Sequence, residues 1–176
     1  MGHKDPVMEY IESAETMANR LAAQGIKLYY HNHHIEFEKY DGQFLLDIMK
    51  NSTSKLGFEL DVHWIHRGGE NPIEVIKRFE GRISLIHLKD YRIGRIEMTE
   101  EDYKEPSKFS QKFTNIIEFA ELGKGSLDIK GIIEAGLDSG VQYFLIEQDD
   151  TYGRDPFDCL ETSANYLRKL GYSDWF

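Results

Sequence analysis

Four short segments rich in β-forming residues alternate with helical segments, and this alternation constrains the fold more than any other feature of the sequence. The β-rich segments are IKLYYHNHH (26–34), KLGFELDVHWI (55–65), RISLIHLKDY (82–91) and VQYFLIEQDD (141–150). Between and around them, apolar residues recur at the spacing of a helix face. Repeated strand–helix units of this kind build parallel sheets, so we expect an α/β fold.

The expected helices are marked by residues that begin and end helices. We place helices at 7–25, 42–51, 71–81, 126–140 and 155–171. Asn71, Ser126 and Asp155 are the expected N-terminal caps, with Pro72 and Pro156 in the first turns. Gly25 and Gly171 are expected to end their helices. The polar stretch 91–121 is too long for a simple connection and reads as an insertion or lid with some helix. We expect a single domain over residues 1–176.

The charge and cysteine content exclude some classes of protein. A net charge of −10 disfavours non-specific binding of nucleic acid or of an anionic membrane, because both need a basic surface. Cys159 is the only cysteine, which is typical of a reducing cytoplasm. The sequence has no long apolar run and no pattern of a signal peptide. We therefore expect a cytoplasmic protein with no membrane or nucleic-acid partner.

Ionisable side chains gather at the carboxyl ends of the expected strands. Alternate residues of a strand share a face. The residues expected to share a face are, strand by strand, Tyr29, His31 and His33; Glu59, Asp61 and His63; His87 and Lys89; and Glu147 and Asp149. Ligands bind at this edge of parallel α/β sheets. A single histidine at a strand end is more often a hydrogen-bonded structural residue than a ligand, but its recurrence with carboxylates at four ends favours a site.

Mixed nitrogen and oxygen ligands of this kind suit Mn²⁺, Fe²⁺, Co²⁺ or Zn²⁺ better than Ca²⁺ or a structural zinc, which prefers thiolates. The sequence therefore predicts a divalent metal site. Which metal it binds stays open, and His31 and His33 are both candidate ligands from their shared face.

Several motifs resemble those of the xylose isomerase-like TIM-barrel superfamily of sugar phosphate isomerases and epimerases, which also contains AP endonuclease-type enzymes. The matching motifs are YHNHHIEF, FELDVHW followed by GGENP, LIHLKD, GKGSLDIKGII, and FLIEQD followed by DP. The resemblance implies a (β/α)8 barrel type. Only four strand–helix units are present here, and they match the second half of such a barrel.

The resemblance also implies the ligand set His31, Asp61, His87 and Glu147, for a divalent metal that includes Mg²⁺ among the candidates. The first ligand is usually a glutamate in a Glu-Asn-His context, whereas this chain has His31-Asn32-His33. The exchange removes one of the two glutamates that act as acid and base in the epimerases of the family. Glu147 remains as a base, and His33, His63 and Lys89 are further candidates for moving protons.

Substrate contacts are expected from Glu36, Trp64 and Arg67, and Arg67, Arg92 and Arg95 lie where they could form a phosphate-binding surface. The leading hypothesis is a metal-dependent isomerase or epimerase of a sugar or sugar phosphate, with lyase or dehydratase chemistry on keto-sugars as a close neighbour. An AP endonuclease-type hydrolase and a non-catalytic, partner-dependent metal-binding fragment are the alternatives. Because a half-barrel has open sheet edges, we expect a homodimer that completes the barrel.

Overall fold

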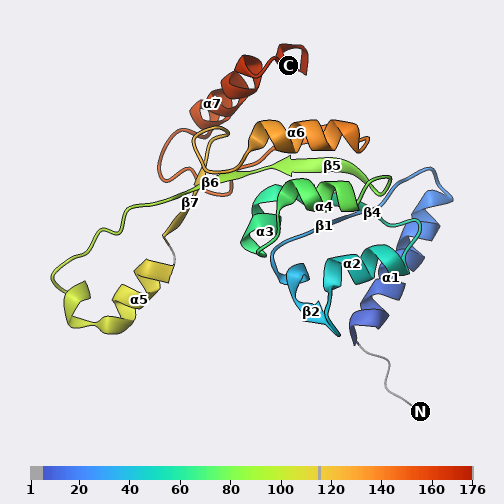
Figure 1. Cartoon of the computed structure of the whole chain (residues 1–176), viewed down its shortest axis with the longest axis horizontal. Coiled ribbons are helices and arrows are strands. Elements are labelled where there is room, and N and C mark those ends of the chain that lie inside the picture. The colour runs from blue at the N-terminus through green and yellow to red at the C-terminus, as the bar shows by residue number, and fades with distance from the viewer. Residues whose placement is uncertain (1–5, 115, 176) are drawn as a thin grey trace. The chain divides into compact units, whose positions relative to one another are not determined.

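The computed structural model describes residues 6–114 and 116–175, and it contains a parallel sheet of four strands (Figure 1). The strands are β1 (Tyr29–His31), β4 (Gly57–Asp61), β5 (Ile83–Leu88) and β8 (Tyr143–Ile146), in the order β1-β4-β5-β8. Strand β4 pairs in parallel with β1 on one side and with β5 on the other. The expected α/β fold with a parallel sheet is confirmed.

Helices and two small antiparallel ladders complete the described structure. The α-helices are α1 (Pro6–Ala22), α2 (Leu45–Ser52), α3 (Val62–Arg67), α4 (Pro72–Arg78), α5 (Pro106–Thr114), α6 (Ile129–Asp138) and α7 (Pro156–Lys169). The 3-10 helices are η1 (Ile35–Phe37), η2 (Asp102–Lys104) and η3 (Ser173–Trp175). Strands β2 (Lys39–Tyr40) and β3 (Gln43–Phe44) pair with each other, as do β6 (Asp90–Ile93) and β7 (Ile117–Ala120).

The chain divides into two compact units. The first comprises the described residues through Leu88 together with Lys130–Leu145, and the second comprises Lys89–Ile129 and the residues from Ile146 onward. The first unit therefore contains β1, β4, β5 and most of β8, which are the strands of the sheet. The second contains the β6–β7 ladder and α7.

One face of the sheet in the first unit is apolar and buried. Phe58 and Leu60 of β4 and Ile86 and Leu88 of β5 are fully buried, and the Phe58 ring contacts Phe79 at a centroid distance of 5.1 Å. Helix α6 approaches the same face, since a Cβ at Gly136 would meet the Phe144 ring and Ile86. Glu59 and Asp61 of β4 and His87 of β5 alternate with these buried residues, as the sequence predicts.

Three predicted helix ends are confirmed by their capping contacts. Asn71 precedes Pro72, and its side chain accepts a hydrogen bond from the N–H of Ile73. The Asp155 side chain caps α7 by accepting hydrogen bonds from the N–H groups of Phe157 and Asp158. After α1, Gly25 adopts a φ of +75°. The N–H of Gly25 donates to Ala22 and that of Ile26 to Leu21, which is a Schellman motif.

The strands are shorter than the sequence predicts. Strand β1 ends at His31, β4 at Asp61, β5 at Leu88 and β8 at Ile146. His33, His63, Lys89 and the pair Glu147 and Asp149 therefore lie just beyond their strands, and the expectation that they share strand faces is wrong. For β4 the reason is a cap: the Asp61 carboxylate accepts the Trp64 N–H and starts α3 at once.

Two predicted helices begin later than expected. Helix α2 begins at Leu45, because residues 43–44 pair with β2 instead. Helix α6 begins at Ile129, so Ser126 is not its cap. The N–H groups of Gly123, Gly125 and Leu127 donate to the carboxylate of Asp90, which holds this segment in an irregular loop.

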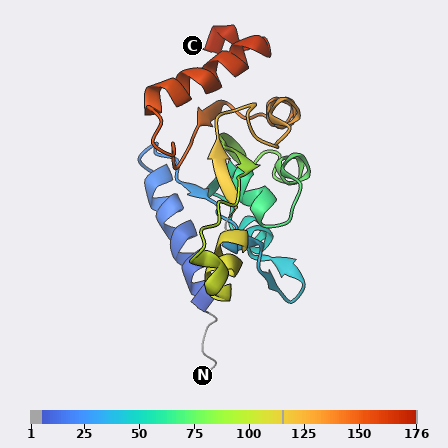
Figure 2. The same ribbon diagram turned by 90° about the vertical axis from the view of Figure 1, so that its left-hand side faces the viewer.

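The 91–121 segment contains most of the β6–β7 ladder together with η2 and α5, so the helix expected within it is present. Figure 2 shows β7 as the yellow arrow beside β6. None of the α5 side chains is buried, and Phe109 and Phe113 stack on each other. That the segment is an insertion or lid in one domain stays a prediction. Among the described residues, no helix is both long and apolar enough to cross a membrane.

Candidate metal centre

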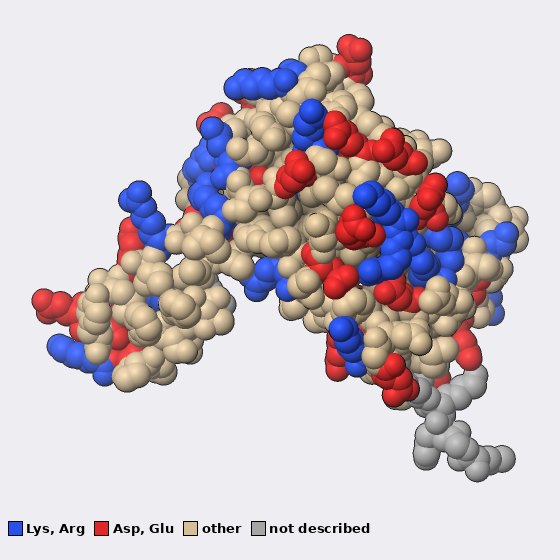
Figure 3. All heavy atoms as spheres, viewed as in Figure 1, with Lys and Arg blue, Asp and Glu red and all other residues tan. Residues whose placement is uncertain are grey.

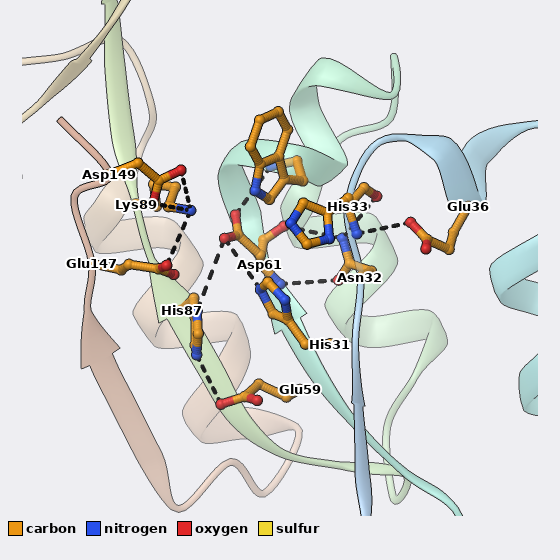
Figure 4. Close-up of polar contacts among 11 residues, drawn as sticks. His31, Asn32, His33, Glu36, Glu59, Asp61, His87, Lys89, Glu147 and Asp149 are labelled. Carbon is orange, nitrogen blue, oxygen red and sulfur yellow. Dashed lines mark hydrogen bonds and ion pairs between the residues drawn. The ribbon is translucent and has the colours of Figure 1, made fainter. Parts of the chain in front are cut away.

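Two imidazoles and a carboxylate of the first unit meet at the carboxyl ends of three neighbouring strands (Figure 4). Nε2 of His31 lies 3.4 Å from Oδ2 of Asp61, and Nδ1 of His87 lies 4.0 Å from the same oxygen. The rings of His31 and His87 are 4.6 Å apart between centroids. These residues come from β1, β4 and β5, so the parallel order of the sheet is what brings them together.

The strand register explains which atoms face one another. His87 is paired with Asp61 across the β4–β5 ladder, whereas His31 is paired with Glu59, two residues earlier on β4. His31 must therefore reach forward along the sheet, and its distal nitrogen Nε2 meets Asp61. His87 lies level with Asp61, and its proximal nitrogen Nδ1 is the one that faces the carboxylate.

The donor atoms of these three residues fit a divalent transition metal. Two atoms that each bind a metal at about 2.1 Å lie roughly 3–4 Å apart, and both nitrogen–oxygen distances to Asp61 are in this range. The carboxylate of Asp61 is fully buried, whereas His31 and His87 keep 25% and 18% of their side-chain surface. Nε2 of His31 is buried and makes no hydrogen bond in the described structure. These donor atoms belong to a group of side chains that could hold a metal ion.

Asn32 fixes Asp61 from the adjacent strand end. Its Oδ1 accepts the N–H of Asp61 at 3.0 Å, and its Nδ2 donates to the carbonyl oxygen of Asp61 at 3.4 Å. Asn32 is fully buried. Sequence patterns pointed to the histidines on either side and not to this residue. The signal that could have found it is an amide between two candidate ligands at a strand end.

The loop that follows β1 is held by Glu36. Its Oε2 accepts the N–H of His33 at 2.8 Å, and its Oε1 accepts the Tyr30 hydroxyl at 2.5 Å. Burial, and then the hydrogen bond to Glu36, raise the pKa of the Tyr30 phenol, so this hydroxyl remains a donor. Glu36 is itself buried. A direct contact of Glu36 with substrate stays a prediction, and in this structure the carboxylate positions His33.

The other histidines and aromatic residues of the first unit pack around Trp64. The rings of His33, His34 and His63 lie 5.3, 5.2 and 4.6 Å from the Trp64 ring between centroids. His33 is exposed and also contacts the His31 ring at 4.9 Å, whereas His63 is buried on α3. Arg67 is exposed at the end of α3.

Lys89 of the second unit is buried and forms ion pairs with two carboxylates. Its Nζ lies 2.9 Å from Oδ1 of Asp149 and 3.3 Å from Oε1 of Glu147 (Figure 4). Its ammonium group also lies 5.6 Å from the centre of the Phe119 ring. Glu147 directly follows β8, so two of the predicted site residues, Lys89 and Glu147, interact within this unit. The role of Glu147 as a ligand stays a prediction.

A scan against protein-family models finds no match. The sequence is similar to an inosose dehydratase of Lacticaseibacillus casei, with 25% identity over 155 residues that cover 87% of this chain and 51% of that protein. The chain thus spans about half the length of the curated relatives it matches.

Solved structures show the same relation in three dimensions. A sugar phosphate isomerase/epimerase from Parabacteroides distasonis ATCC 8503 superposes with a TM-score of 0.70 at 23% identity, covering 93% of this chain and 53% of that one. A xylose isomerase domain protein from Planctomyces limnophilus gives a TM-score of 0.63 at 17% identity, covering 93% and 51%. The expected resemblance is confirmed: the chain has the fold of about half of a xylose isomerase-like TIM barrel.

Proposed function

We propose that this chain bears the metal site of a divalent-metal-dependent enzyme that isomerises, epimerises or dehydrates a sugar or sugar phosphate. The observation that carries the proposal is the meeting of His31 Nε2, His87 Nδ1 and Asp61 Oδ2 at the carboxyl edge of the sheet. An inosose dehydratase and a sugar phosphate isomerase/epimerase are among the proteins similar to this chain, which supports a reaction on a sugar.

In this proposal Glu147 is the fourth ligand, because it follows β8, the next strand of the same sheet. Mn²⁺, Fe²⁺, Co²⁺ and Zn²⁺ suit two imidazoles and two carboxylates, and Mg²⁺ is the hardest of the candidates. A bound divalent cation supplies the polarisation of a carbonyl and its neighbouring hydroxyl.

The chain's own residues then move the proton. Glu147 removes a proton from the carbon next to the carbonyl, which leaves an enediolate. Return of that proton to the neighbouring carbon, with a proton moved between the two substrate oxygens, gives an isomer. Protonation of the original carbon from the opposite face by a second acid gives an epimer. Transfer of the proton to a hydroxyl on the next carbon, which leaves as water, gives a dehydrated ketone. We assign to His33 the exchange of a proton with a substrate oxygen, because it is exposed and contacts the His31 ring.

The remaining predicted residues take supporting roles. Lys89 holds the Glu147 and Asp149 carboxylates. We assign sugar contacts to Trp64, Glu36 and Arg67, and Arg67 binds a phosphate where the substrate has one. We assign a proton-transfer role to His63, whose ring contacts Trp64.

A partner-dependent fragment without activity of its own is the second candidate function. The observation that favours it is length, since the chain spans about half of its curated relatives. An AP endonuclease-type hydrolase fits less well, because such a site needs a basic surface for DNA. On the face drawn in Figure 3, acidic and basic side chains lie beside one another.

The test is the metal content of the purified chain, prepared without chelator or affinity tag and measured by mass spectrometry. We expect about one Mn, Fe, Co or Zn per chain in the wild type. His87→Ala should lose most of it, because one of the three converging donors is gone. His66→Ala is the matched control, since His66 is an exposed histidine of α3.

The outcomes separate the two candidate functions. Metal that is lost in His87→Ala, together with turnover of keto-sugars by the wild type, supports the enzyme. Metal without turnover supports the partner-dependent fragment. Absence of metal after dialysis against Mn²⁺ would refute the metal site itself.

A further inference from the structure

Glu59 lies directly behind the metal-binding edge of the sheet, on the same face of β4 as Asp61. Its Oε1 lies 2.8 Å from Nε2 of His87, the nitrogen that points away from Asp61 (Figure 4). The strand alternation predicted Glu59 on this face without indicating a role for it. Both side chains are mostly covered, with 21% of the Glu59 side chain and 18% of the His87 side chain exposed.

The chemistry of the pair determines where the imidazole proton lies. The roles in this contact depend on the tautomer of His87: Nε2 donates to Glu59 when it carries the imidazole proton, because an ionised carboxylate can only accept hydrogen bonds. A neutral imidazole has one N–H and one nitrogen with a lone pair. In that tautomer the lone pair lies on Nδ1, which faces Oδ2 of Asp61 at 4.0 Å.

We propose that Glu59 is the positioning residue that holds His87 in the tautomer whose Nδ1 binds the metal. The two histidines of the site then bind through different nitrogens, His31 through Nε2 and His87 through Nδ1. Hydrogen bonding of the outer ring nitrogen to a carboxylate orients a histidine ligand and increases its basicity. This inference rests on the proposed metal site and adds a residue that is not itself a ligand.

The strand register makes Glu59 suited to this role. Glu59 is two residues before Asp61 on β4, so its side chain points to the same face one step behind the ligand. His87 is level with Asp61, and its ring spans the distance between the two carboxylates. The hydrogen bond to Glu59 needs no metal, so it orients the His87 ring whether or not a metal is bound.

The first measurement is the tautomer of His87 in the metal-free chain, read from long-range ¹H–¹⁵N correlation spectra at pH 8, where imidazole is mostly neutral. We expect the wild type to show a protonated Nε2 and an unprotonated Nδ1 at His87. In Glu59→Ala the two tautomers should mix, and Glu59→Gln should retain the wild-type tautomer, since its side-chain oxygen still accepts. A protonated Nδ1 in the wild type would overturn the proposal.

The second measurement is the affinity of the same variants for Co²⁺ and Zn²⁺, determined by competition with a chromophoric chelator. Glu59→Ala should weaken binding by about 10- to 100-fold, and Glu59→Gln by less. Glu74→Ala is the matched control, because Glu74 is an exposed carboxylate on α4. Circular dichroism of each variant verifies that it is folded.

The outcomes distinguish this inference from the proposed function. If the wild type and Glu59→Ala bind metal equally well, Glu59 has no positioning role and the proposed metal site still stands. If the wild type itself binds neither ion, the proposed function fails, and the role of Glu59 toward a metal fails with it.

Discussion

Asn32 joins two strand ends through a single side chain. Its amide forms both hydrogen bonds to the backbone of Asp61, and it is fully buried. The bonds run between residues 29 positions apart in the sequence. Such a contact follows from the parallel pairing of β1 with β4.

Replacing Asn32 by alanine should lower the free energy of unfolding by about 1–3 kcal/mol, because the buried N–H of Asp61 loses its acceptor. The metal affinity should fall as well, since the position of Asp61 is no longer fixed. Urea denaturation and chelator competition measure the two effects. Asn51→Ala, at an exposed position of α2, is the control. Unchanged stability in Asn32→Ala would contradict the inferred role of the Asn32 hydrogen bonds to Asp61.

Asp90 has a comparable role in the second unit. Its carboxylate accepts backbone N–H groups of Tyr91, Gly123, Gly125 and Leu127 at 2.9–3.1 Å. A Cβ at Gly125 would lie too close to the Asp90 side chain, so the loop closes tightly on it. The carboxylate is fully buried and satisfies these donors in place of a regular helix start.

Asp90→Ala should therefore destabilise the chain by about 2–4 kcal/mol, because several buried donors lose a charged acceptor. Thermal unfolding followed by circular dichroism measures the change. Asp138→Ala, at the exposed end of α6, should change stability by less than about 0.5 kcal/mol. Equal effects of the two substitutions would show that the Asp90 contacts contribute little.

At the scale of elements, Glu15 ties helix α1 to the segment before β4. Its carboxylate accepts the backbone N–H groups of Ser54, Lys55 and Leu56 and the hydroxyl of Ser54. Burial opposes the charge, but these hydrogen bonds outweigh it and lower the pKa of Glu15 to about 2. The ionised form is therefore the one that the folded chain stabilises.

This lowered pKa predicts a pH dependence of stability. The unfolded-state pKa is near 4.5, so the contribution of Glu15 is fully present above that value and is lost as the pH falls toward 2. Glu15→Gln should lower stability at pH 7 by about 1–2 kcal/mol and reduce the loss between pH 5 and 2. Glu9→Gln on the same helix is the control. Parallel stability curves for wild type and Glu15→Gln would exclude this coupling.

At the scale of the whole molecule, the described part of the sheet has two outer strands. Strands β1 and β8 each have one neighbour in the order β1-β4-β5-β8. Tyr143 of β8 is 62% exposed and Leu145 is 39% exposed. Open edges with apolar side chains favour pairing with a second chain, and the homodimer therefore remains our proposal.

We expect the chain to self-associate reversibly at micromolar concentration, measured by sedimentation equilibrium. Tyr143→Lys should raise the dissociation constant about tenfold or more, because a charged side chain blocks an edge strand. Tyr10→Lys, at an exposed tyrosine of α1, is the matched substitution. A chain that stays monomeric at all concentrations would contradict the proposed pairing.

Metal binding should also stabilise the folded chain as a whole. At a metal concentration about 100-fold above the dissociation constant, the expected gain is about 2.7 kcal/mol. Differential scanning calorimetry with Co²⁺, and again after addition of EDTA, measures the gain and its reversal. The gain should be absent in His87→Ala. A stabilisation of equal size in that variant would show that the ion binds elsewhere.

The sequence by itself determined the strand–helix alternation, the apolar face of the sheet and the capped helix starts at Asn71 and Asp155, because these follow from local periodicity and capping chemistry. It did not determine where the strands end, since Asp61 begins a helix through its own side chain. Only the tertiary structure decided that Asn32 fixes Asp61, that Glu59 contacts His87, and which nitrogen of each histidine faces the carboxylate. These depend on strand register, which is set by contacts between residues far apart in the chain.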